Sequence, residues 1–238
     1  MALSDVQIER FSRQIILPQI GGAGQQRLLD ASVALGGRGP TLEIAALYLA
    51  GSGVGRIALH GPANRLAAAV IERHPEVRIS AHAEAPGVHG RDDADASCDV
   101  LIGADLSLAD LDRAAAARRP LIAGGTDGPR GWLVVGESGG VCASCAARSR
   151  ALRDPRAAAD DRAGLRPAPT RHTPATGLHL VSIAAGVIGA LLATEALKLL
   201  LGLGGGHGPA WLQFDAQTST VTEVPFTRAA DCPVCGAG

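Results

Sequence analysis

Four of the five cysteines form two pairs with the same spacing, Cys142-x-x-Cys145 and Cys232-x-x-Cys235. Each C-x-x-C turn presents two thiolates, and two such turns supply the four sulfurs that Zn²⁺ binds in a tetrahedron. No histidine or carboxylate completes the set, so the predicted zinc site is closed and structural, and it would join the C-terminal tail to the body. A redox-active C-x-x-C and four unrelated thiols are the alternatives. The fifth cysteine, Cys98, precedes an apolar run and is predicted to be a buried, unreactive side chain.

A glycine-rich turn is the second feature that could take part in ligand binding or catalysis. Gly37 and Gly39 follow a short apolar run, at the first two glycine positions of a G-x-G-x-x-G dinucleotide fingerprint. Pro40 comes next and removes one backbone N–H from any phosphate cradle, and Leu42 occupies the third glycine position. The turn alone is therefore weak evidence for nucleotide binding.

The elements around this turn form a βαβ unit, with strands predicted at 32–36 and 56–60 and a helix between them at 41–50. The alternation continues with helices at 64–73, 108–117 and 177–201 and strands at 77–81, 99–102, 119–123, 132–135, 210–215 and 218–225. This pattern predicts an α/β fold: a Rossmann-like doubly wound sheet, parallel in its front half, with antiparallel strands toward the C-terminus and a zinc-stapled tail.

The N-terminal segment is predicted to be a polar helix from Ser4 to Ile16, capped by Ser4 and ended by Pro18 and glycines 21, 22 and 24, with a short helix at 25–30. Residues 148–174 lack any period and are predicted to be a long loop.

We therefore expect one domain over residues 1–238. Its parts would be a helical arm (1–30), a nucleotide-binding-type half (32–135), and a segment with the zinc knuckles, the crossover loop, the long helix and the last strands (136–238).

Composition excludes some function classes. With 22 basic and 23 acidic residues and 3% aromatics, the 238-residue chain lacks the basic excess and stacking side chains of nucleic-acid-binding surfaces. The N-terminus shows no secretory signal. The apolar stretch 177–201 is long enough to cross a membrane, but Glu195 and Lys198 favour a buried helix, so a cytoplasmic protein is expected.

Several blocks of sequence resemble one known family. They are LSD at 3–5, RFSRQIILP at 10–18, YLA with GVG within 48–55, and GVIG with EALKLL within 186–200. Together with the placement of the two C-x-x-C pairs, these blocks are similar to ThiF/MoeB/HesA proteins, relatives of the ubiquitin-activating enzymes. The resemblance spans nearly the whole chain. It implies a dimer that uses Mg-ATP to adenylate the C-terminal Gly-Gly of a small ubiquitin-like sulfur carrier.

The chain departs from the family pattern at the residues that would contact ATP. Gly61 stands where the family has an acid for the ribose hydroxyls, and most of the following loop, with its phosphate-binding cations, is missing. Arg65 is the nearest substitute cation, although a solvated role is the simpler interpretation. Asp105 matches the magnesium-holding acid only if the register shifts by one residue, since Leu106 is the ungapped equivalent. The transfer cysteine ahead of the long helix is absent from 170–175.

Arg13 is retained, and by resemblance it corresponds to an arginine that family dimers extend into the neighbouring active site. An ordinary surface arginine is the alternative. Three functions remain: an adenylyltransferase with reduced ATP chemistry; a silent scaffold that pairs with a complete homologue and donates Arg13 in trans; and, disfavoured by Gly61, an NAD(P)-dependent oxidoreductase. His172, His179 and His207 show no ligand spacing and are unassigned.

Overall fold

The computed structural model describes residues 3–61, 64–82, 98–117, 119–136, 142–153, 175–203 and 210–236. Within these residues, one eight-stranded sheet has the strand order β3-β2-β1-β4-β5-β6-β7-β8. The strands are β1 (Ser32–Gly37), β2 (Arg56–His60), β3 (Arg78–His82), β4 (Val100–Ala104), β5 (Leu121–Asp127), β6 (Arg130–Gly136), β7 (Ala210–Asp215) and β8 (Thr220–Pro225). The first five are parallel and the last three are antiparallel to their neighbours, as the sequence predicts.

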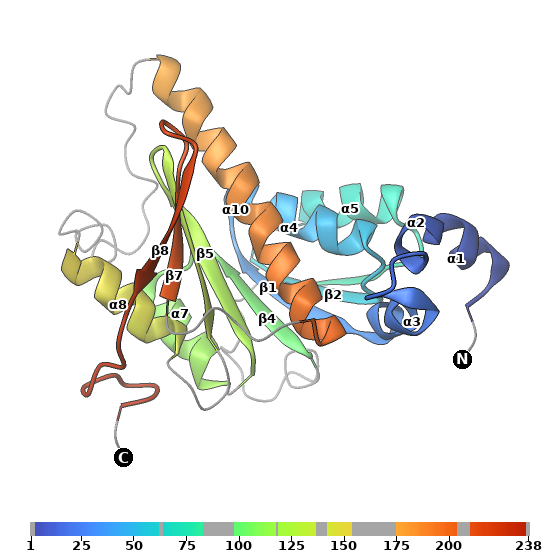
Figure 1. Cartoon of the computed structure of the whole chain (residues 1–238), viewed down its shortest axis with the longest axis horizontal. Coiled ribbons are helices and arrows are strands. Elements are labelled where there is room, and N and C mark those ends of the chain that lie inside the picture. Colours follow the sequence, from blue (N-terminus) through green and yellow to red (C-terminus); the bar gives the residue numbers. More distant parts are fainter. Residues whose placement is uncertain are drawn as a thin grey trace.

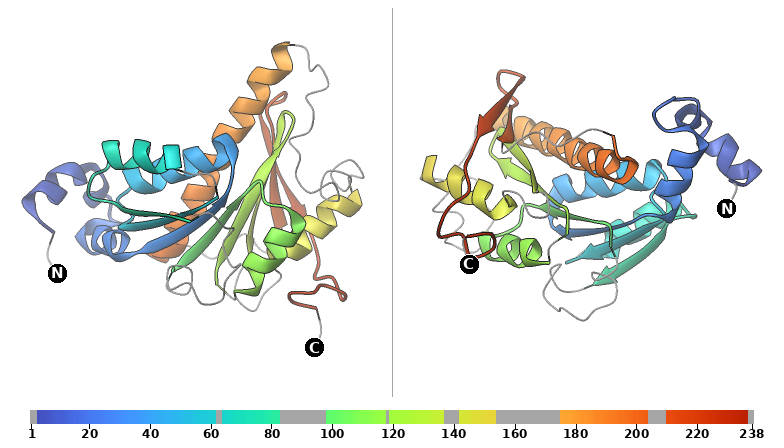
Figure 2. Two further views of the ribbon diagram at one scale, coloured as in Figure 1. Left: turned by 180° about the vertical axis from the view of Figure 1, so that it is seen from behind. Right: turned by 60° about the horizontal axis from the view of Figure 1, so that its bottom comes forward.

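Helices cover both faces of the sheet (Figures 1 and 2). They are α1 (Asp5–Arg10), α2 (Ser12–Ile15), α3 (Gly21–Asp30), α4 (Gly39–Gly51), α5 (Asn64–Arg73), α7 (Leu108–Ala116), α8 (Ala143–Arg153) and α10 (Ala175–Leu201). Buried side chains of α4, α5 and α10 share one core with the sheet, while α7, α8 and the cysteine-bearing tail share the other. Helices on both faces of one mostly parallel sheet are typical of a doubly wound fold.

The order of the strands creates a topological switch point between β1 and β4, and the region outside the carboxyl ends of these two strands is called the crevice below. The chain runs from β1 through α4 to β2 in one direction and from β4 through α7 to β5 in the other, so the two crossovers cover opposite faces. Gly36 pairs with both His60 and Gly103, which aligns the carboxyl ends of β2, β1 and β4. Ligands of open α/β sheets bind outside the carboxyl ends of the strands at such a switch point.

The longest helix, α10, packs along α4 and across β4, β5 and β6. Gly189 permits this close approach, since a Cβ there would lie 2.6 Å from the backbone oxygen of Thr41. By length and composition, Leu180–Leu201 could cross a membrane, with 44% of its most apolar window buried inside the structure. Its Glu195 carboxylate is buried and is bound by Lys198 at 2.8 Å. The helix therefore covers the sheet as a core helix, as the buried interpretation predicts.

The N-terminal arm differs from the single predicted helix. Ser4 caps α1 through a reciprocal capping box with Gln7, as expected from its sequence, but the helix ends at Arg10 and α2 begins at Ser12. Phe11, at the junction, is only 1% exposed. It packs so closely on Gly53 that a Cβ at that glycine would lie 2.8 Å from the Phe11 ring. Burying this one aromatic ring on the domain explains the break.

Two further predictions are wrong. Gly21, Gly22 and Gly24 begin α3 rather than ending a helix. A Cβ on Gly24 would lie 3.2 Å from Leu201, so the small residue lets α3 lie against the end of α10. Residues 148–153, predicted as loop, continue α8. The rest of that predicted loop, 154–174, and the side chains of His172, His179 and His207 lie outside the described residues.

Candidate functional site

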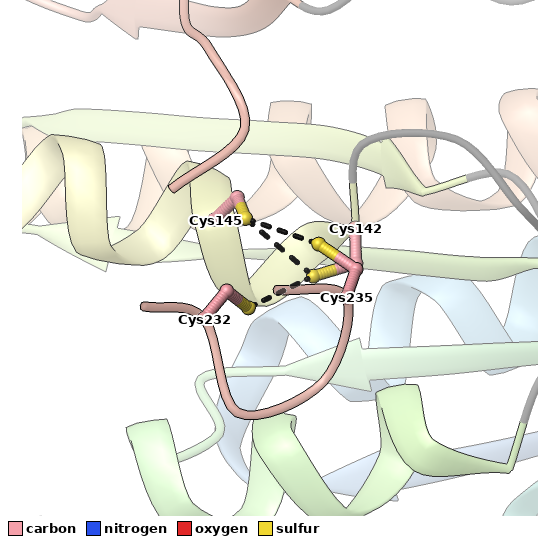
Figure 3. A group of neighbouring side chains, drawn as sticks. All are labelled: Cys142, Cys145, Cys232 and Cys235. Atoms are coloured by element: carbon pink, nitrogen blue, oxygen red, sulfur yellow. Dashed lines mark hydrogen bonds between the residues drawn. The ribbon is translucent and has the colours of Figure 1, made fainter. Parts of the chain in front are cut away.

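The four paired cysteines come together in one cluster, with their sulfurs directed toward one another (Figure 3). The Sγ atoms of Cys142 and Cys145 are 3.8 Å apart, those of Cys142 and Cys232 are 3.6 Å apart, and those of Cys145 and Cys235 are 3.3 Å apart. All four lie within 4.8 Å of one another. Among the described residues, this is the one group of three or more cysteines, histidines and carboxylates so arranged.

Two tight turns hold these sulfurs. The first pair lies where α8 begins, and the Cys145 N–H donates to the Cys142 carbonyl at 3.0 Å. In the tail, the Gly236 N–H closes the second turn on the Cys232 carbonyl at 2.8 Å. The Ala229 N–H donates to the Cys145 sulfur at 3.4 Å and so attaches the tail to the first pair. The cluster therefore connects α8 to the C-terminal tail, as the spacing predicts.

The thiols differ in acidity. Burial tends to raise the pKa of Cys232, but backbone N–H groups of Cys235 and Val234 donate to its sulfur and lower the pKa to about 6. Burial raises the pKa of Cys145 to about 11 and also raises that of Cys142. Without a cation, burial thus disfavours two of the thiolates, which is typical of a cluster whose charge a metal ion compensates.

The donor set fits one four-coordinate metal ion. Four sulfurs placed about 2.3 Å from Zn²⁺ in a tetrahedron lie about 3.8 Å from one another. Three of the observed separations are 3.3 to 3.8 Å, and no pair is more than 4.8 Å apart. With four protein ligands such an ion has no open position for substrate. The chemistry that the cluster can supply is therefore structural.

The predicted glycine turn lies at the carboxyl edge of the sheet. Gly37 has a φ of +124°, and a Cβ there would overlap the carbonyl oxygen of Ala104, the residue paired with it in β4. The Arg38 N–H already donates to that same carbonyl at 3.3 Å, and Pro40 has no N–H. Leu42 packs into the core. The turn therefore keeps its backbone shape but has lost donors that a phosphate would use.

Gly61 faces this turn from the end of β2. Its φ is +106°, which side chains rarely adopt, and a Cβ there would lie 3.1 Å from the Gly37 carbonyl oxygen. The backbone at this position therefore disfavours any side chain, including the ribose-binding acid that the family resemblance implies here. The next helix begins at Asn64, so little chain is available for a phosphate-binding loop. Arg65, in its first turn, is exposed to solvent.

Asp105 follows β4 at the same edge. Its φ is +52°, its backbone N–H donates to the Gly124 carbonyl, and its Oδ1 accepts from the Thr126 N–H at 2.8 Å. The carboxylate is thus directed across β5 and is bound by the backbone there. The fold brings Gly37, Gly39 and Asp105 to one crevice, where the Asp105 carboxylate is already bound by the backbone.

Arg13 lies at the opposite edge of the sheet. Its neighbour Arg10 pairs with Glu76 at 2.9 Å and contacts His74 Nδ1 at 2.7 Å, in the turn before β3. Turns that lead into parallel strands lie at the amino edge, and β1 alone separates the two edges by about 20 Å at about 3.3 Å for each of its six residues. Arg13 is exposed there. The structure therefore separates it from the chain's own crevice.

Two features near the carboxyl edge of the sheet were not predicted from the sequence. Burial tends to raise the pKa of Asp110, but hydrogen bonds from Ser107 and Arg113 and the charges of Arg113 and Arg38 lower it. The rings of His60 and His82 stack with centroids 4.9 Å apart. No local pattern could reveal these contacts, because they depend on which strands become neighbours.

Comparisons with known proteins agree with this architecture. The ThiF family profile matches residues 63–234. The Escherichia coli K12 protein named sulfur carrier protein ThiS adenylyltransferase is 29% identical, over 98% of this chain and 97% of that protein. The Haloferax volcanii SAMP-activating enzyme E1 is 28% identical, over 100% of this chain and 92% of that protein. The pig adenylyltransferase and sulfurtransferase MOCS3 is 30% identical over 99% of the chain, which spans only 54% of it.

Solved structures show the same fold. The crystal structure of E. coli MccB has a TM-score of 0.68 over 96% of this chain and 72% of that one, at 16% identity. The structure of MccB with ATP has a TM-score of 0.70 over 96% and 75%, at 17% identity.

Proposed function

Because this chain belongs to the ThiF family, we propose that it handles the C-terminal Gly-Gly of a small ubiquitin-like sulfur-carrier protein in the cytoplasm, with little or no ATP chemistry of its own. The first half of the proposal rests on relatives that span almost the same length and are named as activating or adenylylating enzymes for such carriers. The second half rests on the composition of the crevice.

The observation that carries the second half is the geometry at Gly61. A left-handed glycine lies where a ribose-binding acid is expected, and Asp105 is bound by the backbone of β5. Each positioned donor or cation is worth about 3 kcal/mol of transition-state stabilisation, and a tenfold change in rate is about 1.4 kcal/mol. Losing two or three such groups should slow adenylation by about four to six orders of magnitude.

The test uses the full chain, Mg-ATP and a candidate carrier that ends in Gly-Gly. Calorimetry measures binding of Mg-ATP and of the carrier separately, and pyrophosphate exchange measures adenylation. We expect carrier binding that is lost when the two terminal glycines are removed, together with negligible exchange. Exchange at an ordinary turnover of about 1–10³ s⁻¹ would refute the loss of ATP chemistry. A carrier that binds equally well without its glycines would refute the handling of that terminus.

A second candidate function is that of a silent partner subunit, and the position of Arg13 favours it. Arg13 is exposed on the amino edge, too far away to act in its own crevice. An arginine has the permanent charge and forked donors that suit a polyphosphate oxygen. We therefore propose that the chain pairs with a complete homologue and extends Arg13 to a nucleotide bound there.

The surroundings of Arg13 support a partner at this place. Ile16 is 76% exposed and Leu17 is 46% exposed immediately after it, and Val6 and Ile8 of α1 are exposed as well. Meanwhile Arg10 and Phe11 hold the arm on the domain. An anchored arm that presents apolar side chains beside a cation is suited to contact another protein.

For the cysteine cluster we propose structural Zn²⁺. Four buried or half-buried thiols on two C-x-x-C turns match the ligands and closed geometry of such sites. Bound zinc would hold the tail that follows β8 against α8. Elemental analysis of purified protein tests this, with one zinc ion per chain expected and a metal-free, fully folded chain contradicting it.

A further inference from the structure

A partly buried polar link connects α7 to the cysteine cluster. The Ser144 hydroxyl donates to Asp112 Oδ1, and Arg148 Nη2 donates to Asp112 Oδ2 at 2.7 Å. Asp112 lies on α7, while Ser144 and Arg148 lie one turn apart on α8. One carboxylate on the first helix therefore binds two successive turns of the second.

Ser144 places this link directly against the sulfurs. It stands between Cys142 and Cys145 in the chain, and its side chain is fully buried. Its Oγ is 4.0 Å from the Sγ of Cys232, which belongs to the other pair. A single hydroxyl thus contacts the Asp112 carboxylate on one side and a thiol of the tail on the other.

We propose that Asp112 is a positioning residue for the metal, acting through Ser144 and Arg148. This inference rests on the proposed zinc site. The first pair of thiols lies in the turn that begins α8, so the rotation of that turn decides where the two sulfurs point. Asp112 fixes the rotation at two positions before any metal binds. Partners one step removed from a metal's ligands change its affinity by about 10–100-fold.

Charge is balanced within the link. Four thiolates around one Zn²⁺ leave an excess of two negative charges, to which Asp112 adds another. The Arg148 guanidinium neutralises the carboxylate at 2.7 Å. The pair can therefore lie beside an anionic cluster without repelling it, and removing only the carboxylate leaves the Arg148 cation, which does not repel the cluster either.

The experiment compares zinc release from the full-length, zinc-loaded protein and three variants. Asp112→Ala removes the link, and Asp112→Asn keeps an acceptor for Ser144. Asp110→Ala removes another carboxylate of α7, which accepts from the N-cap Ser107 and from Arg113. A chromophoric chelator reports the rate of zinc transfer, and Co²⁺ substitution reports the ligand geometry through its visible spectrum.

We expect at least tenfold faster zinc release from Asp112→Ala with an altered Co²⁺ spectrum, an intermediate rate from Asp112→Asn, and an unchanged rate from Asp110→Ala. Equal release from Asp112→Ala and wild type would overturn the proposal. So would a Co²⁺ spectrum identical to that of wild type, because Asp112 would then only tie two helices together. All measurements start from folded, metal-loaded protein, and a wild type that binds no metal would instead refute the zinc site itself.

Discussion

The cysteine cluster packs on one face of the sheet whose carboxyl edge forms the crevice between β1 and β4, but the two sites differ in how complete they are. The cluster has all four donors, backbone N–H donors to the sulfurs of Cys145 and Cys232, and a partly buried polar link behind it. The crevice keeps its strand order and the left-handed Gly37, while Gly61 carries no side chain, Pro40 has no N–H and Asp105 is bound by the backbone of β5.

This difference shows that residues needed for the fold and residues needed for nucleotide chemistry can be distinguished in one chain. Architecture depends on parts that hold the fold together, and the cluster and the Gly37 turn are such parts. Nucleotide chemistry depends on polar groups that contribute little to packing, and the proposed loss of ATP chemistry concerns only those groups. A scaffold that docks a protein partner needs the former and not the latter.

The largest effect is expected at the cluster, and it tests whether the cluster is a complete structural metal site. Cys232→Ala should abolish metal binding and strongly lower the melting temperature, because zinc binding is worth roughly 10 kcal/mol or more in small zinc domains. Zinc content and thermal unfolding measure the two effects. Cys98→Ala is the control. Because Cys98 is buried outside the cluster, this variant should keep its zinc. A Cys232 variant that melts like wild type would remove the metal's structural role.

A second prediction asks whether the crevice is kept as architecture. Gly37→Ala should destabilise the protein by about 3 kcal/mol or more, because its Cβ would overlap the Ala104 carbonyl in a strained conformation. Gly39→Ala should cost only about 1–2 kcal/mol, since its φ is +79° but nothing lies within 4 Å. Denaturant unfolding compares the two. Equal losses would show that the close approach at Gly37 is unimportant.

The third prediction concerns Arg13 in a mixed dimer with a complete homologue. Arg13→Ala should lower turnover of the dimer by tenfold or more, about 1.4 kcal/mol, while dimerisation persists. Arg228→Ala, an exposed arginine beside the second cysteine pair, serves as the control and should leave turnover unchanged. Equal turnover with both variants would leave Arg13 as an ordinary surface residue.

The smallest effect is expected where the arm docks. Burial, and then the Arg10 charge, lower the pKa of His74 below its usual 6.5, while Glu76 raises it and Arg73 lowers it. Because the unfolded chain binds this proton more tightly, stability contributed by neutral His74 is present above pH 6.5 and declines as the pH falls below it. His74→Asn should melt with a shallower pH dependence between pH 7.5 and 5.5. An identical profile would rule out this contribution.

Much of the fold follows from local patterns in the sequence. Short apolar runs alternating with helical periods are enough to predict the βαβ unit, and β2 and α5 have the expected bounds. The pairing of two C-x-x-C turns likewise predicts the ligands. These features could be predicted from the sequence because each depends on residues close together in the chain or on a donor chemistry that few side chains share.

Tertiary structure alone decided the rest. The break at Phe11 exists because its ring packs on Gly53, and Gly24 belongs to a helix because Leu201 lies against it. Asp112 joins the cluster only because α7 and α8 cover the same face of the sheet. In the same way, the order of the strands places Arg13 at the edge opposite the crevice. Contacts between distant segments depend on strand order and helix packing, which no window of the sequence contains.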